Sequence, residues 1–238
     1  MQKILLTRSV DENEILSREL LELGFEPISA PMIVYKILPY DFSLFQNATD
    51  IIITSKFAAK IIADNYPYNV NCYIVGEESA NITKRNIHIN IEYIADTADE
   101  LKEYCKAKFA GVSSASKIIY FSGNIITVPF EYADKHVIYE VEYTDRLEKN
   151  VITAIENEVN YILLYSKNCA ANLIKLLKQY NLLQNIQNSV VIALSSRVAS
   201  EYERYASCVL FPHRPKAVEI IKLLIDYGKG NQRKSGGG

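Results

Sequence analysis

Two segments of this sequence follow one pattern, in which an apolar strand ends at a Ser-Lys pair and a helix follows at once. The first is DIIITSKFAAKII at residues 50–62, and the second is YILLYSKNCAANL at residues 161–173. A strand that passes directly into a helix is the building unit of parallel sheets covered by helices. The repeated corner therefore predicts an α/β fold in which one arrangement is built twice.

The remainder of the chain repeats in a matching order. The paired segments are KILLTRSV (3–10) with KIIYFSGN (117–124), EPISAPMIVY (26–35) with KHVIYEVEYT (135–144), and CYIVGEESANIT (72–83) with SVVIALSSRVASEY (189–202). Short strands rich in Val, Ile and Leu that alternate with helices are typical of parallel sheets covered on both faces. We therefore expect two α/β lobes of similar make.

Composition narrows the classes of protein to which the chain can belong. A length of 238 residues fits one large domain or two small ones. The net charge of −2 provides no basic field for nucleic acid, and no run of 18 apolar residues predicts a membrane span. The start, MQKILLTRS, lacks the apolar region of a signal peptide and is typical of a first strand. We expect a cytoplasmic protein that binds neither nucleic acid nor membrane.

The cysteines and histidines form no recognisable reactive site. Cys72, Cys105, Cys169 and Cys208 show no C-x-x-C pair and no zinc-finger spacing, and no pattern pairs a histidine with a thiol. No Ser/His/Asp order, H-E-x-x-H or calcium loop is present. We expect buried, reduced thiols and no metal site.

The two Ser-Lys corners are the first candidates for a binding site. In open parallel sheets, ligands lie beyond the carboxyl ends of the strands, where Thr54-Ser55-Lys56 and Tyr165-Ser166-Lys167 are expected. A serine there caps the helix, and the free amides of the first helical turn attract anions. Either serine alone is interpreted as an N-cap. Two matched corners, each with a lysine, favour a shared anionic ligand.

Two further corners carry small residues. Gly76 in VGEESA (75–80) allows close approach of the backbone to a ligand, and Gly123 and Asn124 end FSGN (121–124). Neither corner matches G-x-G-x-x-G or the Walker phosphate loop, so nucleotide binding is not predicted. Arg8, Arg197 and Arg214 follow strand ends or loops, and each alone is interpreted as a solvated surface arginine.

Taken in order, eight segments resemble the uroporphyrinogen-III synthase family over nearly the whole chain. They are ILLTRS…LLELGFEPISAPMI, DIIITSKFAA, YIVGEESA, DTADEL, IIYFSGN, VIYEVEYT, YILLYSKNCAANL and VIALSSRVASEY. The resemblance implies two flavodoxin-like parallel-sheet lobes joined by a pair of extended linker strands, with a cleft between them. Lobe 1 would comprise residues 1–36 and 143–230, lobe 2 residues 37–142, and residues 231–238 would form a disordered tail.

The family's substrate is hydroxymethylbilane, a linear tetrapyrrole with eight carboxylates, and its cyclisation needs no cofactor. We expect a monomer, because a hinge between the lobes must move freely, and hand-over of substrate from the preceding pathway enzyme. It places a catalytic tyrosine on the second linker strand, which corresponds to Tyr139 here. The residues expected to bind substrate are Arg8, Thr54, Ser55, Lys56, Gly76, Ser79, Gly123, Asn124, Ser166, Lys167, Ser195, Ser196 and Arg197.

One corner departs from the family pattern. Where members usually show Gly-Pro-Thr-Thr-Ala, this chain has Ser-Ser-Arg-Val-Ala at residues 195–199. Either Ser195, Ser196 and the Arg197 guanidinium replace the missing hydroxyls, or the corner does not bind. Two alternatives to a synthase therefore stay open. One is a non-catalytic two-lobe protein that binds an acidic small molecule, including a degenerate synthase. The other, a flavin-binding protein, is disfavoured because no Ser/Thr-rich phosphate loop is present.

Overall fold

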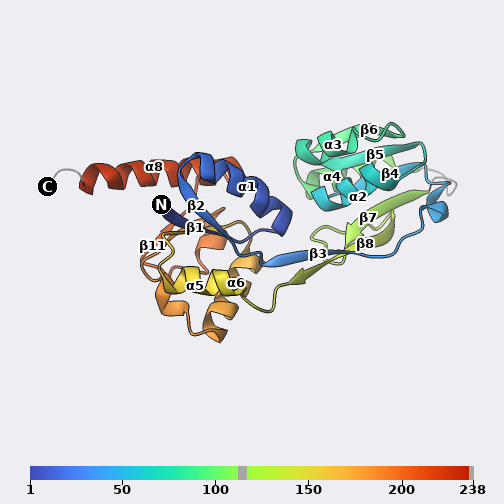
Figure 1. Ribbon diagram of the computed structural model, residues 1–238. Coiled ribbons are helices and arrows are strands. Elements are labelled where there is room, and N and C mark those ends of the chain that lie inside the picture. The colour runs from blue at the N-terminus through green and yellow to red at the C-terminus, as the bar shows by residue number, and fades with distance from the viewer. Residues whose placement is uncertain (112–116, 236–238) are drawn as a thin grey trace. The chain divides into compact units, whose positions relative to one another are not determined.

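The computed structural model describes residues 1–111 and 117–235, with side chains described as far as residue 228. Residues 112–116, within a loop predicted over 111–116, lie outside the described residues. The chain divides into two compact units, residues 1–34 with 142–238 and residues 35–141. Each unit is an α/β structure built on a largely parallel sheet, which confirms the predicted fold class (Figure 1).

The first unit contains a five-stranded sheet in the order β11-β10-β9-β1-β2, in which each neighbouring pair is parallel. Its strands are β1 (Gln2–Leu6), β2 (Phe25–Ser29), β9 (Tyr161–Leu164), β10 (Val190–Ala193) and β11 (Cys208–Leu210). Its helices are α1 (Val10–Glu22), α5 (Lys149–Glu156), α6 (Lys167–Gln179), α7 (Ser196–Ala199) and α8 (Ala217–Ser235), with the 3₁₀ turn η2 (Leu183–Ile186).

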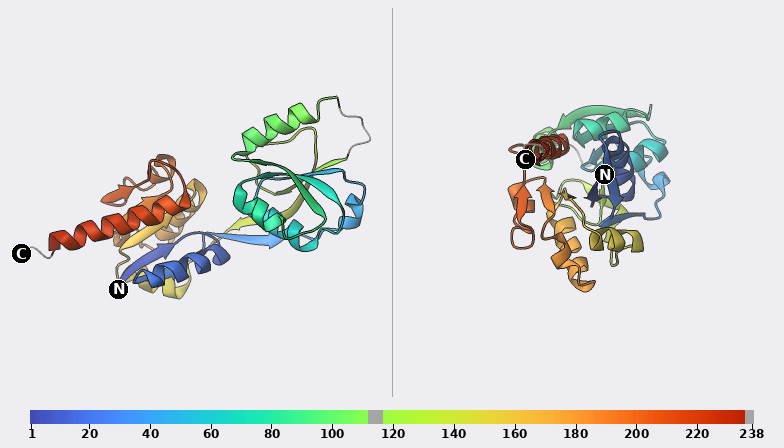
Figure 2. Two further views of the ribbon diagram at one scale, coloured as in Figure 1. Left: turned by 90° about the horizontal axis from the view of Figure 1, so that it is seen from above. Right: turned by 60° about the vertical axis from the view of Figure 1, so that its left-hand side comes forward.

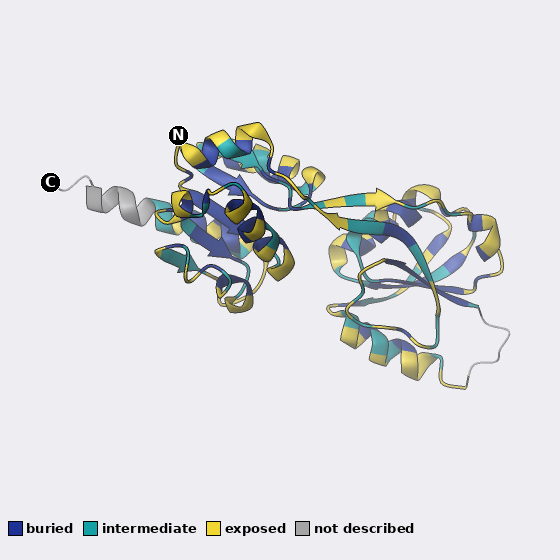
Figure 3. Ribbon diagram, turned by 90° about the horizontal axis from the view of Figure 1, so that it is seen from below, coloured by how far each residue is buried: buried dark blue, intermediate teal, exposed yellow. Residues whose placement is uncertain are grey.

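Helices cover both faces of this sheet. Leu16 and Leu20 of α1 and Leu224 of α8 pack on one face, and α5, α6 and α7 pack on the other (Figure 1). The central strands β9 and β10 and residues Ile4–Leu6 of β1 are almost wholly buried, whereas the edge strands β2 and β11 are half-buried (Figure 3). Sheets covered on both faces need strands that are apolar on both sides, which explains the uninterrupted ILL and YILL runs.

The second unit contains a six-stranded sheet in the order β3-β8-β7-β4-β5-β6. Its strands are β3 (Ile33–Ile37), β4 (Asp50–Ile53), β5 (Val70–Val75), β6 (Ile89–Ala95), β7 (Ile118–Gly123) and β8 (Asp134–Tyr143). Its helices are α2 (Lys56–Asn65), α3 (Glu77–Thr83) and α4 (Ala98–Lys108), with the 3₁₀ turn η1 (Phe42–Phe45). Helices α2 and α3 pack on one face and α4 on the other (Figure 2).

The two sheets share one strand order, and this explains the repeated segments. Strands β2-β1-β9-β10-β11 form the flavodoxin-like order 2-1-3-4-5. Strands β8-β7-β4-β5-β6 form the same order, although β7 and β8 come last in the chain. The Ser-Lys corners that follow β4 and β9 therefore occupy equivalent places, next to β7 and β1.

Two extended segments connect the units along the chain. Pro27 and Pro31 keep the first out of a helix, and it continues into β3, which neighbours β8 in the six-stranded sheet. In the first unit, the Thr144 amide donates to the Met32 carbonyl (3.1 Å). The Asn172 side chain donates to the Thr144 carbonyl (2.8 Å), so α6 is tied to the base of both segments.

Helix α1 begins at Val10, where Asp11 and Glu12 favour the amino end of a helix. Helix α8 continues to Ser235, so residues 231–235, which were expected in a disordered tail, are helical. None of the described helices is both long enough and apolar enough to span a membrane.

Candidate functional site

The predicted residues of the second unit gather at one edge of its sheet. Strands β4, β5 and β7 are parallel neighbours, so their carboxyl ends lie together. Thr54 and Ser55 follow β4, Gly76 follows β5, and Asn124 follows β7. Strands β7 and β4 flank the place where the strand order reverses, which is where ligands bind in open α/β sheets.

Both corner serines cap the helix that follows them. The Ser55 hydroxyl accepts a hydrogen bond from the Ala58 amide (3.1 Å), and the Ser166 hydroxyl accepts one from the Cys169 amide (3.1 Å). Both serines have extended backbone angles, as N-cap residues do. The N-cap interpretation of each serine is therefore correct, and the amides ahead of the bonded one remain available to an anion.

The lysine beside each serine forms an ion pair with the next corner of its own unit. Lys56 lies 2.7 Å from a carboxylate oxygen of Glu78, and Lys167 lies 3.3 Å from one of Glu201. A lysine in the first turn of a helix is unfavourably placed in the helix dipole, and the glutamates offset this. An anion that binds either lysine has to compete with a carboxylate already there.

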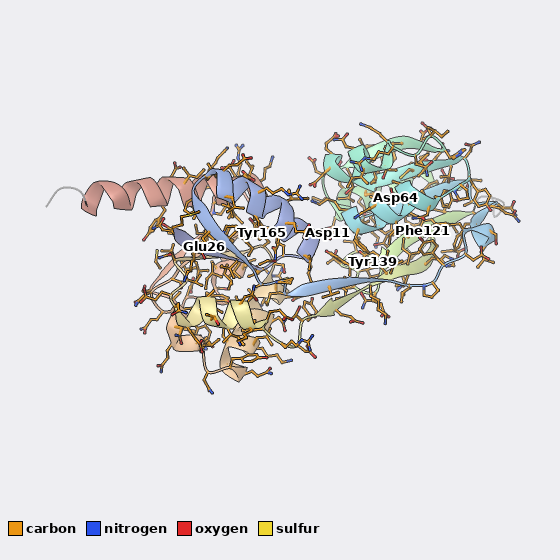
Figure 4. All side chains as sticks on the ribbon, in the orientation of Figure 1. Asp11, Glu26, Asp64, Phe121, Tyr139 and Tyr165 are labelled. Atoms are coloured by element: carbon orange, nitrogen blue, oxygen red, sulfur yellow. The ribbon has the colours of Figure 1, made fainter. Side chains whose placement is uncertain are left out.

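Tyr139 lies on β8 beside Gly123 of β7, with which it is paired in the sheet (Figure 4). Its side chain is 5% exposed and packs against the rings of Phe57 (5.0 Å between centroids) and Tyr35 (5.8 Å). The phenol donates to the Ser55 hydroxyl at 2.9 Å. A Cβ atom at residue 123 would lie 2.6 Å from two ring carbons, so only glycine leaves room for the ring.

The environment of Tyr139 keeps its phenol protonated. Burial raises the pKa of Tyr139, and the neighbouring Ser55 hydroxyl and Gly123 backbone lower it in part. Because desolvation is the largest of these effects, the phenol is neutral at pH 7 and can donate a proton to a hydrogen bond.

Other predicted residues of this unit serve partly structural roles. The Thr54 hydroxyl shares a hydrogen bond with the Tyr120 phenol (2.9 Å), and the side-chain oxygen Oδ1 of Asn124 accepts from the Val141 amide (2.9 Å). Gly76 has a φ of +84°, which favours glycine, and Ser79 is buried in α3. These contacts fix the loops at the carboxyl edge of the sheet.

In the first unit, Arg8 lies at the equivalent edge, after β1. Its guanidinium forms an ion pair and a hydrogen bond with Glu12 and lies over the ring of Tyr165, 4.6 Å from the centroid. Burial raises the pKa of Tyr165 to about 12, and the Arg8 charge opposes this rise. Arg8 is therefore held at the corner with its charge compensated by Glu12.

The corner at residues 195–199 differs from the other two serine corners. The Ser195 hydroxyl makes no hydrogen bond to the first turn of α7, and Ser196 and Arg197 are exposed. The Ser55 and Ser166 hydroxyl oxygens each accept a hydrogen bond from the first turn of their helix, whereas the Ser195 hydroxyl accepts none from α7. The corner therefore keeps polar groups that can meet a ligand.

Several features of these edges were not predicted. Glu78 and Glu201 form ion pairs with Lys56 and Lys167. Of the two, Glu78 lies within the VGEESA segment (75–80), which the sequence analysis had singled out. Among the described residues, Ser122 of β7 has a buried hydroxyl with no hydrogen-bond partner, and nothing in the sequence marks it. No group of three His, Cys, Asp or Glu side chains suited to a metal occurs within residues 1–111 and 117–235.

A separate cavity of about 370 Å³ lies in the first unit, between the segment after β2 and the start of α5. Met32, Leu147 and Val151 line it, together with charged residues such as Arg146 and Glu148. None of the predicted site residues lines this cavity. The corners, which combine helix termini and hydroxyls, offer more of the chemistry that recognises an anion.

One family model matches most of this chain. The family described as "Uroporphyrinogen-III synthase HemD" matches residues 14–222. An uncharacterized protein of Rickettsia prowazekii (strain Madrid E) is 30% identical, over 96% of this chain and 100% of that protein. Uroporphyrinogen-III synthetase from Helicobacter pylori 26695 aligns with a TM-score of 0.58 at 12% identity, over 95% of this chain and 100% of that one. A mutant uroporphyrinogen III synthase from Thermus thermophilus aligns with a TM-score of 0.54 at 10% identity, over 98% and 100%. At such identities, these two structures show the fold alone.

Proposed function

Because this chain belongs to the uroporphyrinogen-III synthase family, we propose that it converts hydroxymethylbilane to uroporphyrinogen III, with inversion of ring D. The substrate is a linear tetrapyrrole that carries eight carboxylates. The observation that carries the proposal is the hydrogen bond between Tyr139 and Ser55 at the carboxyl edge of β4, where the strand order reverses. A neutral donor and an anion-binding helix start meet at this place.

Anion binding without a large positive charge suits this chain, whose net charge is −2. The amides at the starts of α2 and α6 can hold carboxylates without adding formal charge. Lys56 and Lys167 each place one cation at their serine corner. Arg8 places another after β1, and Arg197 places one at the corner of residues 195–199. We propose that these groups, together with Gly76, Ser79, Asn124 and the Ser195 corner, bind the carboxylates of the bilane.

The proposed reaction starts at the hydroxymethyl group of ring A. Its carbon–oxygen bond breaks, the oxygen leaves as water, and the pyrrole becomes an azafulvene. Ring D attacks this electrophile through its already substituted carbon, and the resulting spiro intermediate breaks and recloses with ring D inverted. Overall, one molecule of water is lost, so the protein would be a cyclising hydro-lyase, and no cofactor is needed.

The protein's main contribution is to hold the bilane in one folded conformation. A free bilane closes without inversion to the type I isomer, so the enzyme must determine which carbon of ring D attacks. Orientation of this kind is worth up to about 7–11 kcal/mol in favourable cases. Tyr139, the counterpart of the family's tyrosine, would contribute to a hydrogen-bond donor near the leaving oxygen.

One assay tests this proposal. The purified protein is given fresh hydroxymethylbilane, the products are oxidised, and the isomers are separated by chromatography. Type III product above the level of a protein-free control supports a synthase, whereas type I alone rejects it. We expect a cytoplasmic monomer, and light scattering during gel filtration measures the mass against 27.0 kDa.

A second candidate is a non-catalytic protein that binds an acidic small molecule. The Ser-Ser-Arg-Val-Ala run at residues 195–199 favours it, because the two threonines usual in the family are absent. Such a protein would bind uroporphyrinogen III or the bilane without accelerating formation of the type III isomer. Binding measured by fluorescence of the oxidised porphyrin, in the absence of turnover, would establish it.

A further inference from the structure

The Ser55 hydroxyl accepts two hydrogen bonds at once. One comes from the Ala58 amide (3.1 Å) and the other from the Tyr139 phenol (2.9 Å). A hydroxyl oxygen has two lone pairs and carries one hydrogen. With both lone pairs engaged, the remaining capacity of Ser55 is to donate its own hydrogen.

The two hydroxyls differ in their access to a ligand. Tyr139 is 5% exposed, and its ring is enclosed by Phe57, Tyr35 and the Gly123 backbone. Ser55 is partly exposed at the carboxyl edge of the sheet. A ligand at this edge can therefore reach Ser55 while the phenol stays covered.

We propose that Tyr139 acts through Ser55, and that the Ser55 hydroxyl is the group that donates to an acceptor oxygen of the bilane. This inference rests on the proposed function and assigns the roles within it. Ser55 is the residue that touches substrate, and Tyr139 is a positioning residue. The acceptor is either the leaving oxygen of ring A or a carboxylate oxygen, and the kinetic constants distinguish the two.

The phenol also strengthens the donor that it positions. The phenol donates to the Ser55 hydroxyl, and Ser55 is left to donate outward. Hydrogen bonds in such a chain polarise one another, so each member donates more strongly than it would alone. The twin corner offers a contrast: among the described residues, the Ser166 hydroxyl meets only Cys169, and no tyrosine donates to it.

A double-mutant cycle tests the chain of hydrogen bonds from Tyr139 through Ser55. Tyr139→Phe and Ser55→Gly should each slow type III formation about tenfold, equivalent to about 1.4 kcal/mol. Because both remove the same donor chain, the double variant should also be slowed about tenfold. A double variant slowed about a hundredfold would show independent actions and overturn the proposal, as would either single variant with the wild-type rate.

Matched variants separate this effect from helix capping. Glycine is preferred to alanine at residue 55 because it loses only a few tenths of a kcal/mol as an N-cap. Ser55→Thr keeps the hydroxyl and should restore most of the rate. Ser166→Gly combined with Tyr139→Phe should give multiplied effects, since Ser166 takes no part in the hydrogen bonds of Tyr139 and Ser55.

The kinetic constants identify the acceptor. A fall in kcat assigns the leaving oxygen as the acceptor, and a rise confined to KM assigns a carboxylate. Either result supports the proposal that Tyr139 acts through Ser55.

A second measurement needs no substrate. In protein labelled with ¹³C at the tyrosine Cζ, the Tyr139 signal is assigned from the Tyr139→Phe variant and titrated with base. Once the phenol is ionised, the Ser55 hydroxyl can turn to donate to the phenolate oxygen, which lowers the pKa of Tyr139, so Ser55→Gly should raise this pKa. An unchanged pKa would overturn the pairing. If the wild-type protein forms only the type I isomer, the proposed function fails, and this titration still decides the pairing.

Discussion

Gly123→Ala should destabilise the protein by forcing Tyr139 out of its place. The added methyl carbon would lie 2.6 Å from Cε2 and Cζ of the ring and 2.9 Å from its oxygen. Carbon atoms in contact are normally about 3.5–4.0 Å apart, so the overlap is about 1 Å. Phe57 and Tyr35 enclose the ring, so it cannot move aside without displacing them.

The size of the effect follows from three contributions. Overpacking a core costs about 1–3 kcal/mol. Loss of the hydrogen bond from Tyr139 to Ser55 adds about 0.5–1.5 kcal/mol. Against these, alanine is more favourable than glycine within a strand by about 0.5–1 kcal/mol. The free energy of unfolding should therefore fall by about 0.5–4 kcal/mol.

Urea unfolding measures this change. The chain contains no tryptophan, so far-UV circular dichroism and tyrosine fluorescence follow the transition. In a Tyr139→Ala background the ring is gone, and Gly123→Ala should then cost nothing. Gly228→Ala is the matched control, because its methyl would meet only the Tyr161 oxygen at an ordinary 3.7 Å. As a helical glycine, it should gain up to about 1 kcal/mol. Equal destabilisation by Gly123→Ala in both backgrounds would refute the assignment to the ring.

Three further predictions follow from other contacts. Glu78→Gln and Glu201→Gln should change stability by less than about 1 kcal/mol, because both ion pairs are partly exposed, yet each should lower the KM for the bilane by removing a carboxylate that competes for the lysine. Asn172→Ala should lower the free energy of unfolding by about 1–3 kcal/mol in urea titrations, because the Thr144 carbonyl loses its donor. Burial raises the pKa of Tyr66 to about 12, whereas the unfolded chain loses this proton near pH 10. Stability should therefore fall as the pH rises from about 10 to about 12, by about 1.4 kcal/mol per pH unit from this group, and Tyr66→Phe should make the measured fall shallower.

The local patterns in the sequence were sufficient to predict the fold class. Strands such as ILL and YILL are apolar on both sides, and each is followed by a helix with a serine or glycine at its start. These features depend on neighbours within about ten residues, so they can be recognised without tertiary structure. The N-cap roles of Ser55 and Ser166 belong to the same class of local information.

Contacts between distant segments could not be predicted in this way. Tyr139 is 84 residues from Ser55, and their hydrogen bond exists only because β8 lies beside β7, which in turn lies beside β4. The same neighbourhood explains why residue 123 is glycine: the constraint comes from the ring of Tyr139, not from a turn. The ion pairs of Lys56 and Lys167 likewise depend on which corners are adjacent.

The sequence by itself thus determined that this chain builds two parallel-sheet units with serine-capped helices, because strand burial and helix capping are short-range properties. Only the tertiary structure decided which hydroxyl points to which, since strand order brings together residues that no local pattern connects. The donor assigned to Ser55, with Tyr139 behind it, is a property of that strand order.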